Sequence, residues 1–287
     1  MKLNKKTKLV FILVAFFLIG LAVPSYSWTR KNVKEIETFY NSKLSPIIMI
    51  PGSSATENRF DGLVRKLNQD HRGVKHSLLK VKVWNNGRIT FEGKIKDKDN
   101  EPVIVIGFEN NKDGYYNIKK QTKMMNQAFE ALQNKYNFNN FKGLGHSNGG
   151  LIYTAFIENY LSDYDVKINS LMTIGTPYNF TETNIKNKSV MLADFIAAKE
   201  NIPSTLHVYS VAGTITYDSD ELVPDASVSA GKYIYQNQAK SYTEITVTGE
   251  DAQHSDLPTN DEVVELIKQH IEGQGVRKKQ KTKLEPQ

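Results

Sequence analysis

The segment with the clearest chemical content is Gly145-His146-Ser147-Asn148-Gly149-Gly150, which fits the pattern Gly-x-Ser-x-Gly. In a nucleophile elbow of this kind, the serine occupies a strained turn with positive φ between a strand and a helix, and its hydroxyl projects into solvent. The residues two before and two after the serine crowd each other, so that only Gly145 and Gly149 fit there. Ser147 is the candidate nucleophile, and an ordinary glycine-rich turn is the alternative.

A serine in this position is followed along the chain by an acid and then by a histidine. Three histidines follow Ser147, of which His207 lies within an apolar run and His270 lies in the terminal helical segment. His254 lies in a loop between the last predicted strand and the last predicted helix. Loops at the C-terminal edge of a parallel sheet gather catalytic groups, so His254 is the predicted general base.

The residues alone do not decide which carboxylate is the acid that pairs with His254. Segment 217–225 follows a predicted strand and contains four carboxylates, namely Asp218, Asp220, Glu221 and Asp225. Composition does not separate them, and a solvated acidic loop is the alternative reading for three of the four.

Two backbone N–H groups are expected to bind the oxyanion of a tetrahedral intermediate. One belongs to Asn148, directly after the nucleophile at the start of a helix. The other comes from the loop 52–55 after the first buried strand, where we favour Ser53 over its neighbour Ser54. A plain strand-to-helix turn is the alternative for this loop.

These residues need a scaffold that brings several strand ends together, and the chain alternates short β-type runs with helical periodicity. Strands are predicted over 47–50, 78–84, 88–96, 103–108, 141–145, 168–174, 206–212 and 243–247. Asn86-Gly87 predicts a type I′ hairpin turn between the second and third of them. The pattern is typical of an α/β fold with a mostly parallel central sheet and helices on both faces.

Helices are predicted over 58–69, around 118–136, after the elbow and at the end of the domain. Thr259 and Glu262 have capping-box spacing at the start of the last one. The domain is expected to cover 28–273. Within it, segment 178–203 interrupts the strand rhythm and is either a small cap over the site or a surface helix. The basic stretch 274–287 lacks apolar periodicity and is predicted to be disordered.

The first 27 residues combine four lysines with an apolar run, Leu9–Val23, and with small residues at Ser25 and Ser27. This pattern is typical of a secretory signal cleaved before Trp28. As a helix the apolar run spans roughly 22 Å, which is short of the ~30 Å hydrocarbon core of a membrane. The alternative is an uncleaved signal anchor. Either reading predicts an exported protein, secreted or held at the cell surface or membrane.

Composition excludes several classes of function. The chain has no Cys, which removes disulfides, thiolate nucleophiles, Cys-ligated metals and a lipoprotein anchor. The six His show no metal-ligand spacing, so neither a metal nor another cofactor is expected. The net charge of +6 resides in the two ends, because 28–276 holds 28 basic and 30 acidic residues. Nucleic-acid binding is therefore disfavoured, whereas contact of the basic tail with anionic lipid or wall polymer is a hypothesis.

Three sequence features together resemble a known family. They are the elbow, the stretch Ser219-Asp220-x-x-Val223-Pro224 followed by Ser227, and His254-Ser255-x-Leu257. Over about 47–270 the chain is similar to α/β-hydrolases of Gram-positive bacteria described as cell-surface hydrolases, a domain of unknown function. The resemblance implies the α/β-hydrolase fold and makes Asp220 the acid of the catalytic triad. Glu221 stands where the family often has Gly, and Pro51-Gly52 stands where His-Gly is common.

The predicted function is cleavage of carboxylic esters through an acyl-enzyme, with a small molecule or a lipid as the acyl ester substrate. One alternative is a cell-surface binding protein that keeps the fold without catalysis. Another is a lipase or acyltransferase acting on membrane or wall lipids. The identity of the substrate and the oligomeric state stay open.

Overall fold

The computed structural model describes residues 4–69, 74–215 and 217–272, which divide into a unit within 1–42 and a unit within 43–287. The first unit is helix α1 (Lys5–Tyr40), in which the Asn4 side chain caps the N-terminus and Pro24 is accommodated. Of the described helices, α1 is the one long and apolar enough to cross a membrane, over Lys8–Tyr40. A signal sequence has the same properties, so cleavage before Trp28 stays a prediction. The predicted disordered tail, 274–287, lies outside the described residues.

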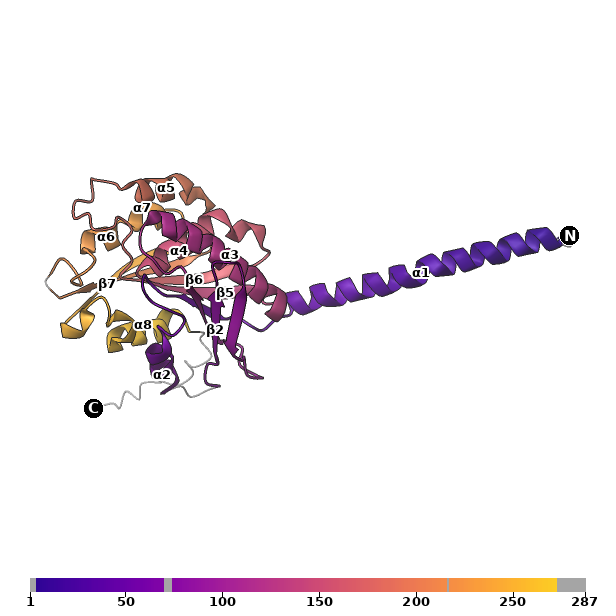
Figure 1. Ribbon diagram of the computed structural model, residues 1–287, viewed down its shortest axis with the longest axis horizontal. Helices are drawn as coiled ribbons and strands as arrows, with labels where there is room; N and C mark the ends of the chain where they lie inside the picture. Colours follow the sequence, from indigo (N-terminus) through magenta and orange to yellow (C-terminus); the bar gives the residue numbers. More distant parts are fainter. Residues whose placement is uncertain (1–3, 70–73, 216, 273–287) are drawn as a thin grey trace, which may run out of the picture. The chain divides into compact units, whose positions relative to one another are not determined.

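The second unit is built on an eight-stranded sheet with the order β3-β2-β4-β1-β5-β6-β7-β8 (Figure 1). Every neighbouring pair is parallel except β2 and β3. The sheet confirms the predicted mostly parallel α/β architecture. The strands are β1 (Ile47–Ile50), β2 (Leu78–Val83), β3 (Ile89–Gly93), β4 (Val103–Phe108), β5 (Asn140–His146), β6 (Lys167–Ile174), β7 (His207–Thr214) and β8 (Ser241–Thr248).

The hairpin between β2 and β3 forms as predicted, but its turn type differs. Gly87 N–H donates to Trp84 O at 2.9 Å, and Trp84 N–H donates to Arg88 O at 2.9 Å. Of the loop residues only Gly87 has positive φ (81°), whereas a type I′ turn requires positive φ at Asn86 as well. The connection is therefore a three-residue loop, a type I turn followed by a glycine bulge.

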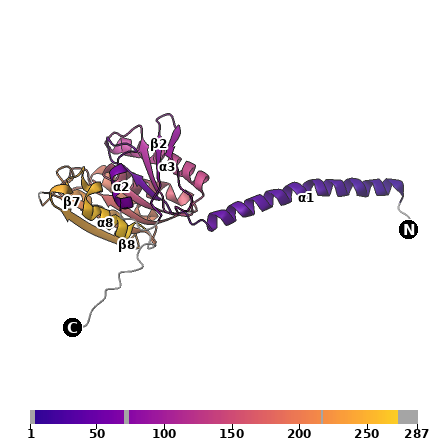
Figure 2. The same ribbon diagram turned by 90° about the horizontal axis from the view of Figure 1, so that it is seen from below.

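Helices cover both faces of the sheet (Figures 1 and 2). Strand β1 is buried on both sides, and its side chains alternate between two cores. Ile48 and Ile50 face a core closed by α3, α4, α5 and α7, whereas Ile47 and Met49 face one closed by α2 and α8. The helices are α2 (Asp61–Gln69), α3 (Tyr115–Tyr136), α4 (Asn148–Asn159), α5 (Val190–Ala198), α6 (Asp225–Ser229), α7 (Lys232–Tyr235) and α8 (Asp261–His270).

Helix α5 lies in the segment predicted to be either a cap or a surface helix. Its residues Met191, Leu192 and Phe195 are buried in the core that contains α4, and Ser189 caps its N-terminus. The helix thus packs one apolar face on the domain, and a role as a cap stays a prediction.

Helix α8 begins one residue later than the predicted capping box requires. The N-cap is Asn260, whose Oδ1 accepts from Val263 N–H at 3.1 Å, and not Thr259. Thr259 belongs instead to a short 3-10 turn, η4 (Leu257–Thr259). An asparagine side chain caps a helix as well as a threonine does, so the two adjacent residues compete for the position and the preceding turn decides it.

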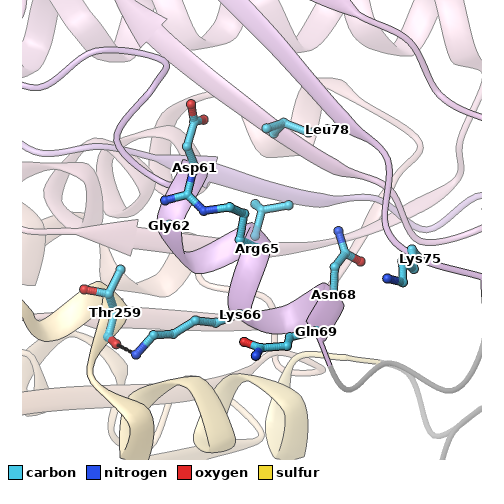
Figure 3. Close-up of a pocket in the computed structure, with 10 residues that line it drawn as sticks. Asp61, Gly62, Arg65, Lys66, Asn68, Gln69, Lys75, Leu78 and Thr259 are labelled. Carbon is cyan, nitrogen blue, oxygen red and sulfur yellow. Dashed lines mark hydrogen bonds between the residues drawn. The ribbon is translucent and has the colours of Figure 1, made fainter.

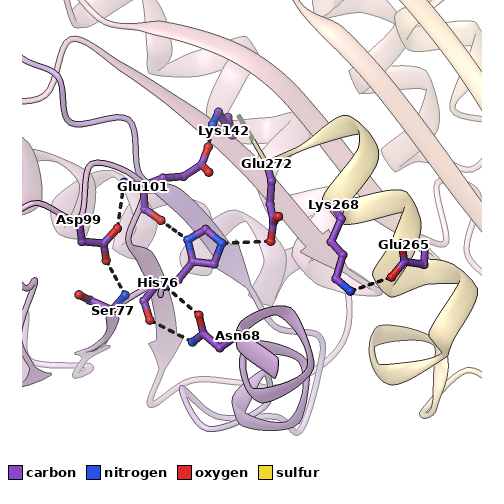
Figure 4. Close-up of polar contacts among 9 residues, drawn as sticks. All are labelled: Asn68, His76, Ser77, Asp99, Glu101, Lys142, Glu265, Lys268 and Glu272. Carbon is purple, nitrogen blue, oxygen red and sulfur yellow. Dashed lines mark hydrogen bonds and ion pairs between the residues drawn. The ribbon is translucent and has the colours of Figure 1, made fainter. Parts of the chain in front are cut away.

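The chain just after α8 is held to the N-terminal ends of neighbouring strands by a polar cluster (Figure 4). His76 lies at its centre, with Nε2 3.0 Å from Glu272 Oε1 and Nδ1 2.6 Å from the Glu101 carbonyl. Lys142 pairs with the Glu101 carboxylate. Because this cluster joins residues just before β2 and β4, and one near the start of β5, to the last described residue, it closes the domain at the end remote from Ser147.

Candidate active site

The predicted elbow lies where β5 ends and α4 begins. Ser147 separates the two elements, with φ 54° and ψ −128°, and its N–H donates to Ile174 O at 2.8 Å. Such a backbone conformation costs a non-glycine residue of order 1–3 kcal/mol, and the flanking strand and helix enforce it. The local geometry therefore has the strain that the sequence pattern predicts.

The two elbow glycines are required by close backbone approach. A Cβ on Gly145 would lie 2.5 Å from Gly150 N and 2.7 Å from Gly149 C, which is the predicted crowding across the turn. A Cβ on Gly149 would lie 2.0 Å from Ile50 O, at the end of β1. Gly149 is thus constrained first by the neighbouring strand, a contact that the pentapeptide alone does not reveal.

The predicted base and one of the four candidate acids lie together. His254 Nδ1 is 2.6 Å from Asp220 Oδ2, and His254 N–H donates to Asp220 O at 3.0 Å. The other carboxylate oxygen, Asp220 Oδ1, accepts from the N–H groups of Leu222 (3.1 Å) and Val223 (2.7 Å). Asp220 is 1% exposed, whereas the other three candidate acids are exposed or half-buried. Geometry therefore singles out Asp220 as the partner of His254.

Contacts at the ends of β5 and β6 bring the Ser147 elbow next to the Asp220–His254 pair. Gly175, directly after the Ile174 that receives the Ser147 N–H, packs against both partners, and a Cβ there would lie 3.1 Å from His254 Nδ1 and from Asp220 Oδ2. No hydrogen bond joins Ser147 Oγ to His254 in the described part of the chain. In unliganded hydrolases this contact is often long and shortens with substrate.

The candidate oxyanion loop packs directly against Ser147. A Cβ on Gly52 would lie 2.7 Å from Ser147 Cβ and 3.3 Å from Ser147 Oγ. Ser54 N–H is occupied, since it donates to Asn111 O at 2.7 Å. The N–H groups of Ser53 and of Asn148, the first residue of α4, have no acceptor among the described residues. Of the two neighbours considered in this loop, Ser53 is the one whose donor is free.

His146 is a site residue that sequence reasoning did not single out. Its ring lies 4.9 Å from that of His254, and its Nε2 is 3.0 Å from the His254 carbonyl oxygen. Burial, followed by the charges of His254 and Arg59, holds the pKa of His146 well below its ordinary value. The imidazole is therefore neutral, and since a carbonyl only accepts, Nε2 carries the proton. Its position beside the nucleophile in the elbow was the only available signal.

Glu221 stands where the family resemblance predicts Gly, and its backbone conformation is one that glycine adopts easily. Its φ is 73°, in the region that favours glycine. Its carboxylate accepts from Gln253 Nε2 at 2.6 Å. This bond joins the loop that carries Asp220 to the loop that carries His254, and it offsets part of the backbone cost of Glu221.

A large open depression of about 850 Å³ lies beside α2, away from these residues (Figure 3). Basic side chains line it, but Lys66 Nζ donates to Thr259 O at 2.7 Å and pairs with Asp261 at 2.6 Å. None of the predicted site residues lines this depression. Across residues 4–69, 74–215 and 217–272, no group of three or more His, Asp or Glu side chains is arranged to hold a metal ion.

The mostly parallel sheet, the serine at a strand-to-helix elbow, and the acid and histidine after later strands together define the α/β-hydrolase fold. Residues 34–274 match the family described as alpha/beta hydrolase of unknown function (DUF915). The chain belongs to this family.

Two solved structures are similar over most of the chain. A protein of Lactobacillus plantarum WCFS1, described as a "putative cell surface hydrolase", is 50% identical, with a TM-score of 0.73 over 79% of this chain and 91% of its own. A protein of Listeria innocua is 29% identical, with a TM-score of 0.72 over 78% of this chain and 92% of its own. No curated protein matches the chain.

Proposed function

We propose that this α/β hydrolase is an exported serine hydrolase that cleaves carboxylic acyl esters, with Ser147 as nucleophile, His254 as base and Asp220 as acid. The observation that carries the proposal is the pairing of His254 with Asp220 beside the strained Ser147 elbow. The free N–H groups of Ser53 and Asn148 would bind the oxyanion of the tetrahedral intermediate.

In the first half of the reaction, His254 Nε2 takes the proton of Ser147 Oγ as that oxygen attacks the ester carbonyl carbon. His254 Nδ1–H donates to Asp220 Oδ2, which fixes the tautomer and stabilises the imidazolium. The carboxylate is itself held by two backbone N–H groups on Oδ1. The leaving alcohol then takes the proton from His254 Nε2.

The tetrahedral intermediate places its oxyanion between the N–H groups of Ser53 and Asn148. Loss of one such donor costs about 10²–10³ in kcat in a serine hydrolase, because the donors are oriented before charge develops. Asn148 also benefits from its place at the N-terminus of α4, where the helix dipole favours negative charge. Water activated by His254 then hydrolyses the acyl-enzyme.

His146 acts as a positioning residue for the base. Its neutral Nε2–H binds the carbonyl of His254 and so fixes the backbone that carries the catalytic imidazole. Since His146 directly precedes Ser147, one residue of the elbow connects the nucleophile strand to the loop of the base.

Export is supported by the apolar character of α1 near the N-terminus and by the similarity to the L. plantarum protein described as a cell surface hydrolase. The substrate is an acyl ester of a small molecule or a lipid, without nucleic acid as a partner. Segment 178–203 is the part of the domain proposed to cap it.

The test is a panel of p-nitrophenyl esters of increasing acyl chain length, measured on the full chain and on Ser147→Ala. The proposal expects hydrolysis by the wild type, loss of at least 10³-fold in Ser147→Ala, and a preferred chain length that separates small-molecule from lipid substrates. Equal rates for the two proteins, or no hydrolysis of any ester, would favour a surface binding protein on a hydrolase fold.

A further inference from the structure

Helices α3, α4 and α5 lie on the same face of the sheet (Figure 1). Residues of these three helices line a second cavity. Its volume is about 310 Å³, at the lower end of the range for small-molecule sites. Apolar groups of Ala155, Phe195 and Ala198 form part of its wall. Glu158 lies 11 residues after Ser147 on α4, roughly 16 Å along the helix axis, so the cavity is separate from the elbow.

The wall of this cavity contains a carboxyl group with no partner. Glu158 is 4% exposed, its Oε1 is fully buried, and it has no hydrogen bond or ion pair through its side chain among the described residues. Burial raises the pKa of Glu158 to about 9, so this side chain is a neutral carboxylic acid at pH 7. A buried carboxyl group without a partner is costly to ionise, unless a cation is supplied.

The surroundings of Glu158 favour a positive ligand over a neutral or negative one. Glu158 lies in the last turn of α4, where the helix dipole places partial negative charge. Across the cavity, Tyr115 OH donates to Asp194 Oδ2 at 2.7 Å. Burial and this bond raise the pKa of Tyr115, so that the phenol keeps its proton and donates it to the Asp194 oxygen.

The basic side chains that line the cavity stand at its exposed rim. Lys119 Nζ lies 4.4 Å from the centre of the Tyr115 ring, and both Lys119 and Lys123 are exposed. Neither contributes to the shift of the Glu158 pKa, which arises from burial. The titratable groups lining the cavity besides Glu158 are Tyr115, Lys119, Lys123, Tyr160 and Asp194.

We infer that this cavity is a binding site for a small organic ammonium ion, whose charged nitrogen pairs with the Glu158 carboxylate and whose apolar body lies against Phe195 and Ala155. The nitrogen supplies the hydrogen-bond donors that Glu158 lacks. Binding ionises Glu158 and therefore releases a proton at neutral pH. The inference does not depend on the esterase activity, because no atom of the Ser147 elbow lines the cavity.

The experiment follows binding of n-butylammonium to the full chain by NMR, with ¹³C at the carboxyl carbons of glutamate. Affinity should rise roughly tenfold from pH 7 to pH 8, since the ionised fraction of Glu158 rises by that factor while an alkylammonium stays charged. Glu158→Gln should weaken binding at pH 8 at least tenfold and remove the pH dependence. Glu130→Gln, which changes an exposed glutamate on α3, should bind as the wild type does.

Three outcomes would overturn the inference. One is equal affinity for n-butanol or butyrate, which share the alkyl body but lack the charge. Another is unchanged n-butylammonium binding by Glu158→Gln. The third is a Glu158 carboxyl resonance that is already ionised at pH 7 without ligand, which would mean that a lysine of the rim occupies the cavity. Because the readout is binding, failure here leaves the ester panel unaffected.

Discussion

Asp220 and Glu158 are both almost inaccessible, at 1% and 4% exposure, yet their surroundings are opposite. Asp220 accepts from two backbone N–H groups and pairs with His254, and it lies where loops after β6, β7 and β8 meet. Glu158 has no partner for its carboxyl group in the described chain and lies at the far end of α4, the helix that begins directly after Ser147.

The comparison shows how the same chemical group serves two purposes. At the sheet edge, the protein supplies hydrogen-bond partners to both oxygens of the carboxyl group, namely two backbone N–H groups and the His254 imidazole. At the end of α4 it supplies none, and the group keeps its proton until a cation enters. The burial of a carboxyl group thus indicates its role only when its hydrogen-bond partners are also known.

The largest effect is expected from Asp220→Asn. An amide keeps the size of the side chain but stabilises the wrong tautomer of His254 and loses the charge beside the imidazolium, so kcat for ester hydrolysis should fall by about 10⁴. Steady-state kinetics on the preferred ester would measure it. Asp218→Asn, in the same loop but exposed, is the matched control and should stay within twofold of the wild type. A comparable loss in both variants would mean that the loop, and not Asp220, is what matters.

A smaller effect is expected on folding stability from Glu158→Gln. Burial raises the pKa of Glu158 to about 9 from an ordinary 4.5, so between these values the folded chain holds a proton that the unfolded chain has released. The wild type should therefore lose stability relative to Glu158→Gln as pH rises from 4.5 to 9, by a few kcal/mol in total, since each pH unit contributes at most about 1.4 kcal/mol. Urea unfolding at several pH values checks this, and parallel curves for the two proteins would contradict it.

The smallest effect is expected from substitution of His146. This residue contacts neither carboxyl group of the comparison, but it holds the backbone of His254, the partner of Asp220. His146→Leu removes the donor to the His254 carbonyl and should lower kcat about tenfold with little change in KM. His146→Gln keeps an N–H donor and should recover part of the loss. If both variants lose equal activity, packing of the ring, and not its hydrogen bond, would be the cause.

Much of the scaffold could be predicted from the sequence because its signals are local. The buried run Ile47–Ile50, the alternation of strands and helices, and the Gly145–Gly149 spacing each follow from nearby residues. Turn details failed where two neighbours compete, as with Asn260 over Thr259 at the start of α8. The choice between alternatives of that kind depends on the preceding turn, which the pattern does not encode.

The site was predictable in residue type but not in its contacts. Segment 217–225 offered four acids, and only the fold shows that Asp220 is the one that reaches His254. Ser53 and Ser54 are alike in sequence, and the bond from Ser54 to Asn111, 57 residues away, separates them. No feature of the sequence pointed to Glu158. Its carboxyl group lacks a partner because of how α3 and α5 pack around it, and this packing cannot be read from the local sequence.

The most direct test of the central claim is covalent labelling of the full chain by a fluorophosphonate, read by intact mass and by mapping of the modified peptide. The account predicts one adduct on the wild type, located at Ser147, and no adduct on Ser147→Ala with its fold retained by circular dichroism. An adduct of equal yield on the folded Ser147→Ala protein would contradict the assignment of Ser147 as the nucleophile.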